Sequence, residues 1–266
     1  MREKTSRIGV IGRTTAIFSV DEIIVYPDDP KLDQTADANL VAALLTYMET
    51  PQYLRKRLFK LEPELRYAGI LPPLRTPHHT LNRKMKNLKV GEYREGVTIS
   101  MKKIGTLVDI GVEKPAYIIN TDLPASQRVT VRITRVNRHI EAKPVKPHEI
   151  PEYWGYKVTG ERSSLGKTIE KRAFDLTIGT SKHGIPFADV TERIEKKWKK
   201  ARTILVAFGS PKQGLHEIFE QEGTSLEEMV DFTVNMIPEQ GTETIRTEEA
   251  LMASLAILGL KFPFNA

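Results

Sequence analysis

The chain contains no cysteine among its 266 residues and has no long apolar run. The missing cysteine excludes disulfides, thiolate metal sites and cysteine nucleophiles, and is typical of a reducing compartment. The longest apolar stretches, at 40–45 and 250–260, are too short to cross a bilayer. Residues 1–7 are charged and lack the apolar core of a secretory signal. We therefore expect a cytoplasmic protein with no membrane span.

Basic residues are clustered, although the formal net charge is only +6. Such clusters favour a polyanionic partner, although a single cluster is also explained by a solvated helix face. Three clusters together favour nucleic acid. They are Arg55, Lys56, Arg57 and Lys60; Arg83, Lys84, Lys86 and Lys89; and Lys196, Lys197, Lys199, Lys200 and Arg202.

Most of the chain alternates between apolar strands and helices, as parallel α/β sheets do. Near the start we predict a strand at 8–11, a loop at Gly12 and Arg13, a short helix to Phe18 and a strand at 23–26. A helix follows at 33–49. After residue 157 we predict strands at 174–179, 203–209 and 231–237, with helices at 187–200, 215–222 and 247–258.

Residues 92–157 differ, because they form short strands broken by glycine, which is the pattern of a small barrel. The predicted strands are 95–101, 105–111, 116–119, 128–136 and 139–145. The sequence thus predicts an α/β domain of residues 1–91 and 158–266, with the barrel of residues 92–157 inserted into it.

One barrel strand carries a candidate RNA-binding face. Val129, Val131 and Ile133 alternate with Arg128, Thr130, Arg132 and Thr134, so one set should face the core and the other the solvent. Arginine pairs bidentately with backbone phosphates, which supply most of the affinity for nucleic acid. An ordinary solvated strand would show the same alternation, but Arg135 follows directly and favours RNA.

Three predicted strands end in loops of small and polar residues, at 179–184, 209–214 and 237–244. Ligands of parallel sheets bind at the carboxyl ends of strands, so the loops should form one pocket. Their glycine spacing matches neither a dinucleotide fingerprint nor a phosphate-binding loop.

Four segments, at 53–79, 175–184, 205–215 and 237–258, make the chain resemble the SPOUT methyltransferases. The resemblance covers essentially the whole chain and is closest to the RNA methyltransferase branch with an inserted OB-like domain. It implies an α/β fold with a knotted parallel sheet, in which the last segment threads an earlier loop. It further implies S-adenosylmethionine as cofactor and a homodimer whose RNA site both subunits complete.

The resemblance also suggests residues for the reaction. Arg13 matches an arginine that is catalytic in related ribose methyltransferases, and Arg246 precedes the last helix. Guanidinium stays protonated, so both should position phosphate or base rather than accept a proton. Thr247 is the polar candidate beside the methyl group, with a helix N-cap as the alternative. The general base is not identified, and methyl transfer from a sulfonium requires no metal.

Further residues follow from the same resemblance. The predicted cofactor contacts are Thr180, Ser181, Phe208, Gly209, Gly214, Ile237, Pro238, Gln240, Gly241, Thr242 and Ile245. The predicted RNA contacts are Arg75, His78, His79, Arg83, Arg128, Arg132 and Arg135, with the two histidines alternatively ordinary loop residues.

Three positions indicate which atom is methylated. Pro211 replaces the acidic residue of the ribose branch, and Ile245 and Thr247 replace its serine and asparagine. These departures favour a base as the acceptor, and family analogy suggests a uridine in ribosomal RNA. The main alternative is a non-catalytic RNA-binding or ribosome-assembly protein on the same scaffold. A metal-dependent nuclease would require convergent carboxylates, and the acidic residues near the start lack that pattern.

Overall fold

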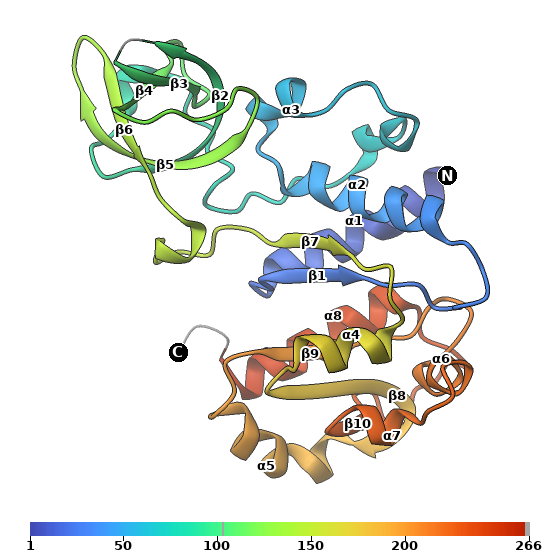
Figure 1. Cartoon of the computed structure of the whole chain (residues 1–266). Helices are drawn as coiled ribbons and strands as arrows, with labels where there is room; N and C mark the ends of the chain where they lie inside the picture. The colour runs from blue at the N-terminus through green and yellow to red at the C-terminus, as the bar shows by residue number, and fades with distance from the viewer. Residues whose placement is uncertain (103, 264–266) are drawn as a thin grey trace. The chain divides into compact units, whose positions relative to one another are not determined.

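The computed structural model of the protein describes residues 1–102 and 104–263. The chain divides into two compact units (Figure 1). Unit 1 comprises Met1–Asp21 and Ala43–Lys157, and unit 2 comprises Glu22–Ala42 and Val158–Ala266. The predicted domain boundary after residue 157 coincides with a boundary between the two units. The predicted boundary after residue 91 lies within unit 1. The insertion of a separate barrel domain stays a prediction.

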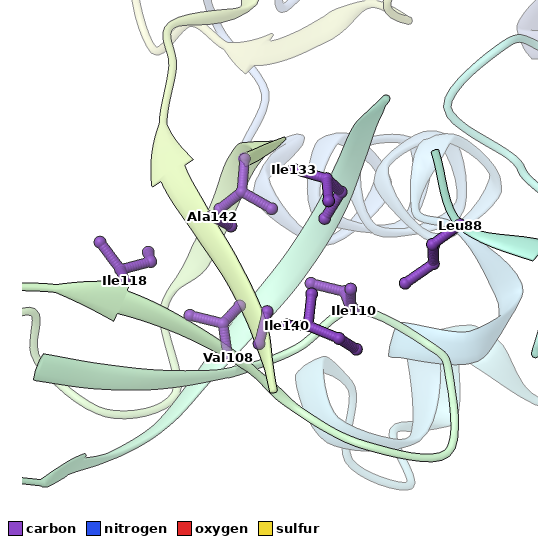
Figure 2. Close-up of a cluster of buried hydrophobic side chains, with 9 residues drawn as sticks. Leu88, Val108, Ile110, Ile118, Ile133, Ile140 and Ala142 are labelled. Carbon is purple, nitrogen blue, oxygen red and sulfur yellow. The ribbon is translucent and has the colours of Figure 1, made fainter. Parts of the chain in front are cut away.

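Unit 1 contains a closed five-stranded barrel, as the glycine-broken strands predicted (Figure 1). Its strands are β2 (Tyr93–Lys102), β3 (Gly105–Asp109), β4 (Ala116–Ile119), β5 (Arg128–Val136) and β6 (Ile140–Pro144). They close in the order β2-β3-β4-β6-β5, with only β4 and β6 paired in parallel. Figure 2 shows apolar side chains of β3 to β6 gathered in the barrel core with Leu88 and Ile110. Val131 and Ile133 point into it, as predicted.

The first helix of unit 1 shows that the strand and loop predicted near the start of the chain are wrong. Residues 8–11 are not a strand but part of α1 (Arg2–Ile17), which contains the predicted loop at Gly12 and Arg13. A short β-branched run does not distinguish a strand from a buried helix. Gly12 allows close helix packing, because a Cβ there would lie 2.8 Å from Tyr156 Oη and 3.0 Å from Leu45 Cδ2.

The predicted helix at 33–49 is present before the barrel. The helix α2 (Thr35–Glu49) runs from unit 2 into unit 1 and is followed by α3 (Gln52–Leu58). Single 3-10 turns occupy Pro63–Leu65, Ala68–Ile70 and Met85–Asn87, and Pro147–Glu149 follows the barrel.

Unit 2 contains a three-stranded parallel sheet in the order β10-β8-β9 (Figure 1). Its strands are β8 (Leu176–Pro186), β9 (Ile204–Ala207) and β10 (Phe232–Asn235), and β1 (Glu22–Val25) pairs separately with β7 (Lys157–Gly160). The helices are α4 (Leu165–Arg172), α5 (Phe187–Trp198), α6 (Leu215–Gln221), α7 (Leu226–Met229) and α8 (Thr247–Lys261). The parallel sheet and three of the helices, α5, α6 and α8, were predicted.

Apolar clusters cover both faces of this sheet. Leu176 and Ile178 pack with α5 and α8, whereas a Cβ on Gly179 would meet side chains of α6 and α7. Successive strand residues point to opposite faces, so the helices are divided between them.

The predicted loop at 179–184 is instead part of a long, irregular strand. Thr233 pairs with Gly179 on β8, but the next residue of β10, Val234, pairs with Ile185. Residues 180–184 therefore leave the pairing with β10 and return to it. Gly184 permits the return, because a Cβ would lie 2.7 Å from the backbone N and C of Val234. We call residues 180–184 the β8 excursion.

Candidate functional site

Three segments meet at the carboxyl ends of the parallel strands in unit 2. The β8 excursion lies within β8, just past its pairing with β9, whereas residues 208–214 follow β9 and residues 236–246 follow β10. Thr180 Oγ1 donates to the carbonyl of Ala207 at 2.9 Å, which ties the β8 excursion to the end of β9. Tyr26 Oη donates to the carbonyl of Phe208 at 2.6 Å. In parallel sheets this edge is where ligands bind.

The segment after β9 is a tight turn held by its own backbone. The amide of Ser210 donates to the carbonyl of Gln213 at 2.9 Å, and Ser210 Oγ accepts from the amides of Lys212 and Gln213. A Cβ on Gly209 would lie 2.7 Å from the carbonyl oxygen of Gln213 and 3.0 Å from Gly214 Cα. Gly209 is therefore required for the turn itself.

The segment after β10 is more open. Gln240 Nε2 donates to the carbonyls of Thr242 and Glu243 at 2.8 and 3.2 Å, so this predicted cofactor contact folds back onto its own loop. Pro238, Gly241 and Thr242 are exposed. A Cβ built on Gly241 meets no atom within 4 Å, which leaves room for a ligand beside the backbone.

The last helix begins at this segment. Arg246, rather than Thr247, is its N-cap, and the carboxylate of Glu249 accepts from the backbone amide of Arg246 at 3.0 Å. The alternative of Thr247 as N-cap is therefore wrong. Its hydroxyl instead donates to the carbonyl of Gly209 at 3.1 Å and connects the start of α8 to the turn after β9. Ile245 is half-buried and Arg246 is exposed.

Three side chains beside the β8 excursion form a chain of hydrogen bonds. His216 on α6 places Nδ1 3.3 Å from Ser181 Oγ and Nε2 3.0 Å from Glu227 Oε1 on α7. A backbone hydrogen bond and the hydrogen bond with His216 lower the pKa of Glu227. The sequence analysis missed His216 and Glu227, because no short motif connects residues from three separate elements.

A buried polar cluster in unit 1 corrects the prediction for Arg128. This arginine forms ion pairs with Glu49 and Glu95, at 2.9 Å for Nη2 to Glu49 Oε1 and 2.6 Å for Nε to Glu95 Oε2. Glu95 also accepts from Thr130 Oγ1 and Trp154 Nε1, each at 2.6 Å. The start of β5 packs against protein rather than solvent, so Arg128 is not on a free face with Arg132 and Arg135.

Glu49 at the end of α2 anchors this cluster. Its side chain is 8% exposed and that of His78 is fully buried. Burial alone would raise the pKa of Glu49, but Arg128 and His78 hold it at about 2. The sequence analysis missed Glu49, because a carboxylate at a helix end is ordinarily solvated.

His78 and His79 are also not free loop histidines. Their Nε2 atoms lie 2.9 and 2.7 Å from the backbone carbonyl of Glu49 and donate to it. Burial lowers the pKa of His79 to about 4, with His78 adding to the effect. Both rings therefore fasten the loop that contains them to the end of α2.

The other predicted cations of unit 1 are accessible. Arg75, Arg83, Arg132 and Arg135 are exposed. Arg132 lies over the ring of Tyr93 at 5.8 Å, and Arg135 pairs with Glu141 at 3.3 Å.

The predicted catalytic arginine of α1 has a structural contact as well. Arg13 Nη1 donates to the carbonyl of Pro73 at 3.1 Å and to that of Leu74. It therefore holds the proline-rich loop to α1. Among residues 1–102 and 104–263, no cluster of three or more His, Asp or Glu side chains could hold a metal ion. In the same described part, no helix combines the length and apolarity that spanning a membrane requires.

Comparison with known proteins identifies the class of the chain as a methyltransferase. Residues 1–258 match the family described as "Putative RNA methyltransferase". The chain belongs to this family.

Relatives with a named activity, and one without, are similar to nearly the whole chain. The 28S rRNA (uridine-N(3))-methyltransferase of Homo sapiens is 34% identical over 96% of this chain and 72% of its own length. The Drosophila melanogaster protein of the same name is 32% identical over 94% of this chain and 56% of its own length. An uncharacterized protein of Halobacterium salinarum is 32% identical over 97% of this chain and 93% of its own length.

Proposed function

We propose that the chain transfers a methyl group from S-adenosylmethionine to N3 of a uridine in ribosomal RNA. The observation that carries this proposal is the set of three loops at the parallel strand ends in a member of an RNA methyltransferase family. The names of the human and fruit-fly relatives supply the uridine and the atom. The departures at Pro211, Ile245 and Thr247 favour a base over a ribose hydroxyl in the same way.

The loops suit a cofactor that is recognised through backbone groups. The space beside the exposed backbone of Gly241 supports this, because a Cβ there would meet no atom within 4 Å. S-adenosylmethionine supplies a methyl group on a sulfonium, which needs alignment with the acceptor more than it needs a metal. We include in the proposal a knotted SPOUT topology and a homodimer in which both subunits complete the RNA site.

Arg13 and Arg246 remain the candidates for positioning the acceptor nucleotide. Their guanidinium groups stay protonated and can pair with phosphate or with a uracil carbonyl. Arg246 is exposed at the start of α8, free to turn toward a bound nucleotide. Thr247 holds the turn at Gly209, so its hydroxyl is a positioning group.

Methyl transfer by the purified protein tests this function. Ribosomal RNA lacking the modification and labelled S-adenosylmethionine should give labelled RNA, and nucleoside digestion should yield 3-methyluridine. Calorimetry should show binding of S-adenosylmethionine in the presence of a metal chelator. Label on a ribose or another base would overturn the proposed acceptor. RNA binding without cofactor binding would favour a non-catalytic ribosome-assembly protein.

We also propose that the barrel is an OB-type RNA-binding module. Numbered by themselves, its strands follow the order 1-2-3-5-4, with the third and fifth parallel. The exposed side of β5 and β6 carries Arg132, Arg135 and Lys143, beside the ring of Tyr93. Cations bind phosphates and aromatic rings stack on unpaired bases, which is how such barrels hold single strands.

Removing two of these arginines should weaken RNA binding without affecting the fold. The Arg132→Ala/Arg135→Ala variant should lower the slope of log affinity against log salt by about 1.5, because each lost phosphate contact contributes about 0.7 to 0.9. Filter binding at several salt concentrations measures this slope. Lys114→Ala, an exposed charge loss on the β3–β4 connection, is the matched control and should leave the slope unchanged. A wild-type slope in the double variant would overturn the assignment of this face.

A further inference from the structure

The hydrogen-bond chain at the β8 excursion has a defined direction. Glu227 can only accept, so His216 Nε2 carries a proton and Nδ1 offers its lone pair to Ser181 Oγ at 3.3 Å. The backbone amide of His183 donates to the same Oγ at 3.1 Å. The hydroxyl of Ser181 thus accepts from a fixed amide and directs its own proton toward the imidazole.

The excursion holds Ser181 in place. Thr180 Oγ1 bonds to the carbonyl of Ala207, and Asn235 Nδ2 donates to the carbonyl of Lys182 at 2.9 Å. Both residues that flank Ser181 are therefore fixed to neighbouring strands. The side chain of His216 is 30% exposed and that of Glu227 is 60% exposed, so the chain of groups is reachable from solvent.

A hydroxyl, an imidazole and a carboxylate in series form the arrangement by which enzymes take a proton from a weak acid. The imidazole accepts the proton, and the carboxylate fixes its tautomer and stabilises the resulting cation. The imide N3–H of uracil is a weak acid and must lose its proton when N3 is methylated. Arginine cannot serve as this base because it stays protonated.

We propose that Ser181, His216 and Glu227 form the proton relay for methylation of uridine N3. This inference rests on the proposed function. The bond from N3 to the methyl carbon forms as the bond from that carbon to the sulfonium sulfur breaks. The N3 proton moves to Ser181 Oγ while the serine's own proton passes to His216 Nδ1. The imidazolium formed beside Glu227 then releases that proton to water, leaving neutral 3-methyluridine and S-adenosylhomocysteine.

The charges around His216 suit this role. Glu227 faces it from α7 and His183 from β8, with the two histidine ring centroids 6.3 Å apart. Hydrogen bonding keeps the pKa of Glu227 below its ordinary value, so the carboxylate stays ionised when the imidazole is charged. His148 is exposed on the turn Pro147–Glu149 of unit 1, outside the relay, which makes it the control histidine.

Single-turnover methylation at saturating RNA and cofactor tests the relay. His216→Ala should lower the rate by about 100-fold near neutral pH, and Ser181→Ala and Glu227→Gln by about 10-fold or more. The rate loss in His216→Ala should shrink as the pH rises from about 6 to 9, because solvent hydroxide replaces the base. Calorimetry should show cofactor affinity within about twofold of wild type for His216→Ala and Glu227→Gln, and His148→Gln should keep the wild-type rate.

Two outcomes overturn the relay specifically. One is a His216→Ala variant with the wild-type rate and pH profile, and the other is a rate loss that follows entirely from weaker cofactor binding. Nitrogen NMR of the imidazole gives an independent test, since the proton should sit on Nε2 and become less fixed in Glu227→Gln. A wild-type protein that binds cofactor but modifies a ribose would refute the proposed uridine acceptor and, with it, the relay.

Discussion

Replacing Arg128 with alanine should lower the free energy of unfolding by about 3 kcal/mol or more, because it leaves buried carboxylates without their partner. Glu49 is 8% and Glu95 2% exposed, and Arg128 joins them. Neither carboxylate can recover its hydration without opening the contact between the barrel and α2. Chemical denaturation followed by circular dichroism measures the loss.

The same strand provides the control. Arg132 is exposed and lies over the ring of Tyr93, so Arg132→Ala should change the unfolding free energy by less than about 0.5 kcal/mol. The double variant Arg128→Met/Glu49→Gln should be more stable than Arg128→Ala, because one of the unpaired charges is removed with it. Equal stabilities of Arg128→Ala and Arg132→Ala would contradict the buried role of Arg128.

The effect should also depend on pH. The pKa of Glu49 is about 2 in the folded protein, below its ordinary value of 4.5. A carboxylate with a lowered pKa stabilises the fold fully above its unfolded value and loses this contribution as the pH falls through the folded value. Without Arg128, the rise in the pKa of Glu49 caused by burial is less opposed in the folded variant. The stability difference between wild type and Arg128→Ala should therefore be largest near neutral pH and shrink as the pH falls toward 2.

The sequence predicted the elements whose cause is local. Five short strands with glycine breaks predicted the barrel, and the apolar alternation that includes Val131 and Ile133 predicted its inner face. The ends of β9 at 207 and of β10 at 235 lie next to the predicted loops, because apolar strands stop where small and polar residues begin. These signals depend only on neighbours along the chain.

The sequence could not predict features that arise from distant partners. From the sequence alone, the strand face with Arg128 is expected to be solvated. In the structure, Glu49 at the end of α2 lies against it, although it is 79 residues away in the chain. The run at 8–11 was predicted as a strand, because the packing of Gly12 against Tyr156 and Leu45 cannot be recognised from neighbouring residues in the sequence. His216 and Glu227 could not be predicted as site residues, because the fold alone brings α6 and α7 next to the β8 excursion.

Placing a valine at Gly241 should reduce affinity for S-adenosylmethionine by about 100-fold while leaving the fold intact. A 100-fold loss corresponds to about 2.7 kcal/mol of binding energy. No atom lies within 4 Å of a Cβ at this position, and the backbone is not in the left-handed region, so valine fits the free protein. Its branched side chain would occupy the space that we assign to the cofactor. The unfolding free energy should change by less than about 0.5 kcal/mol.

The contrast with Gly209 shows why Gly241 is the sharper test. At Gly209 a side chain would collide with the backbone of Gln213, so Gly209→Val should lose stability as well as affinity and does not separate the two. Gly160→Val is the matched control, because a Cβ there also meets nothing within 4 Å and lies in the same unit. Calorimetry with the cofactor, alongside denaturation of all three variants, makes the comparison. Wild-type affinity in a folded Gly241→Val would exclude the loop after β10 from the cofactor site and move the methyl donor to the other two segments.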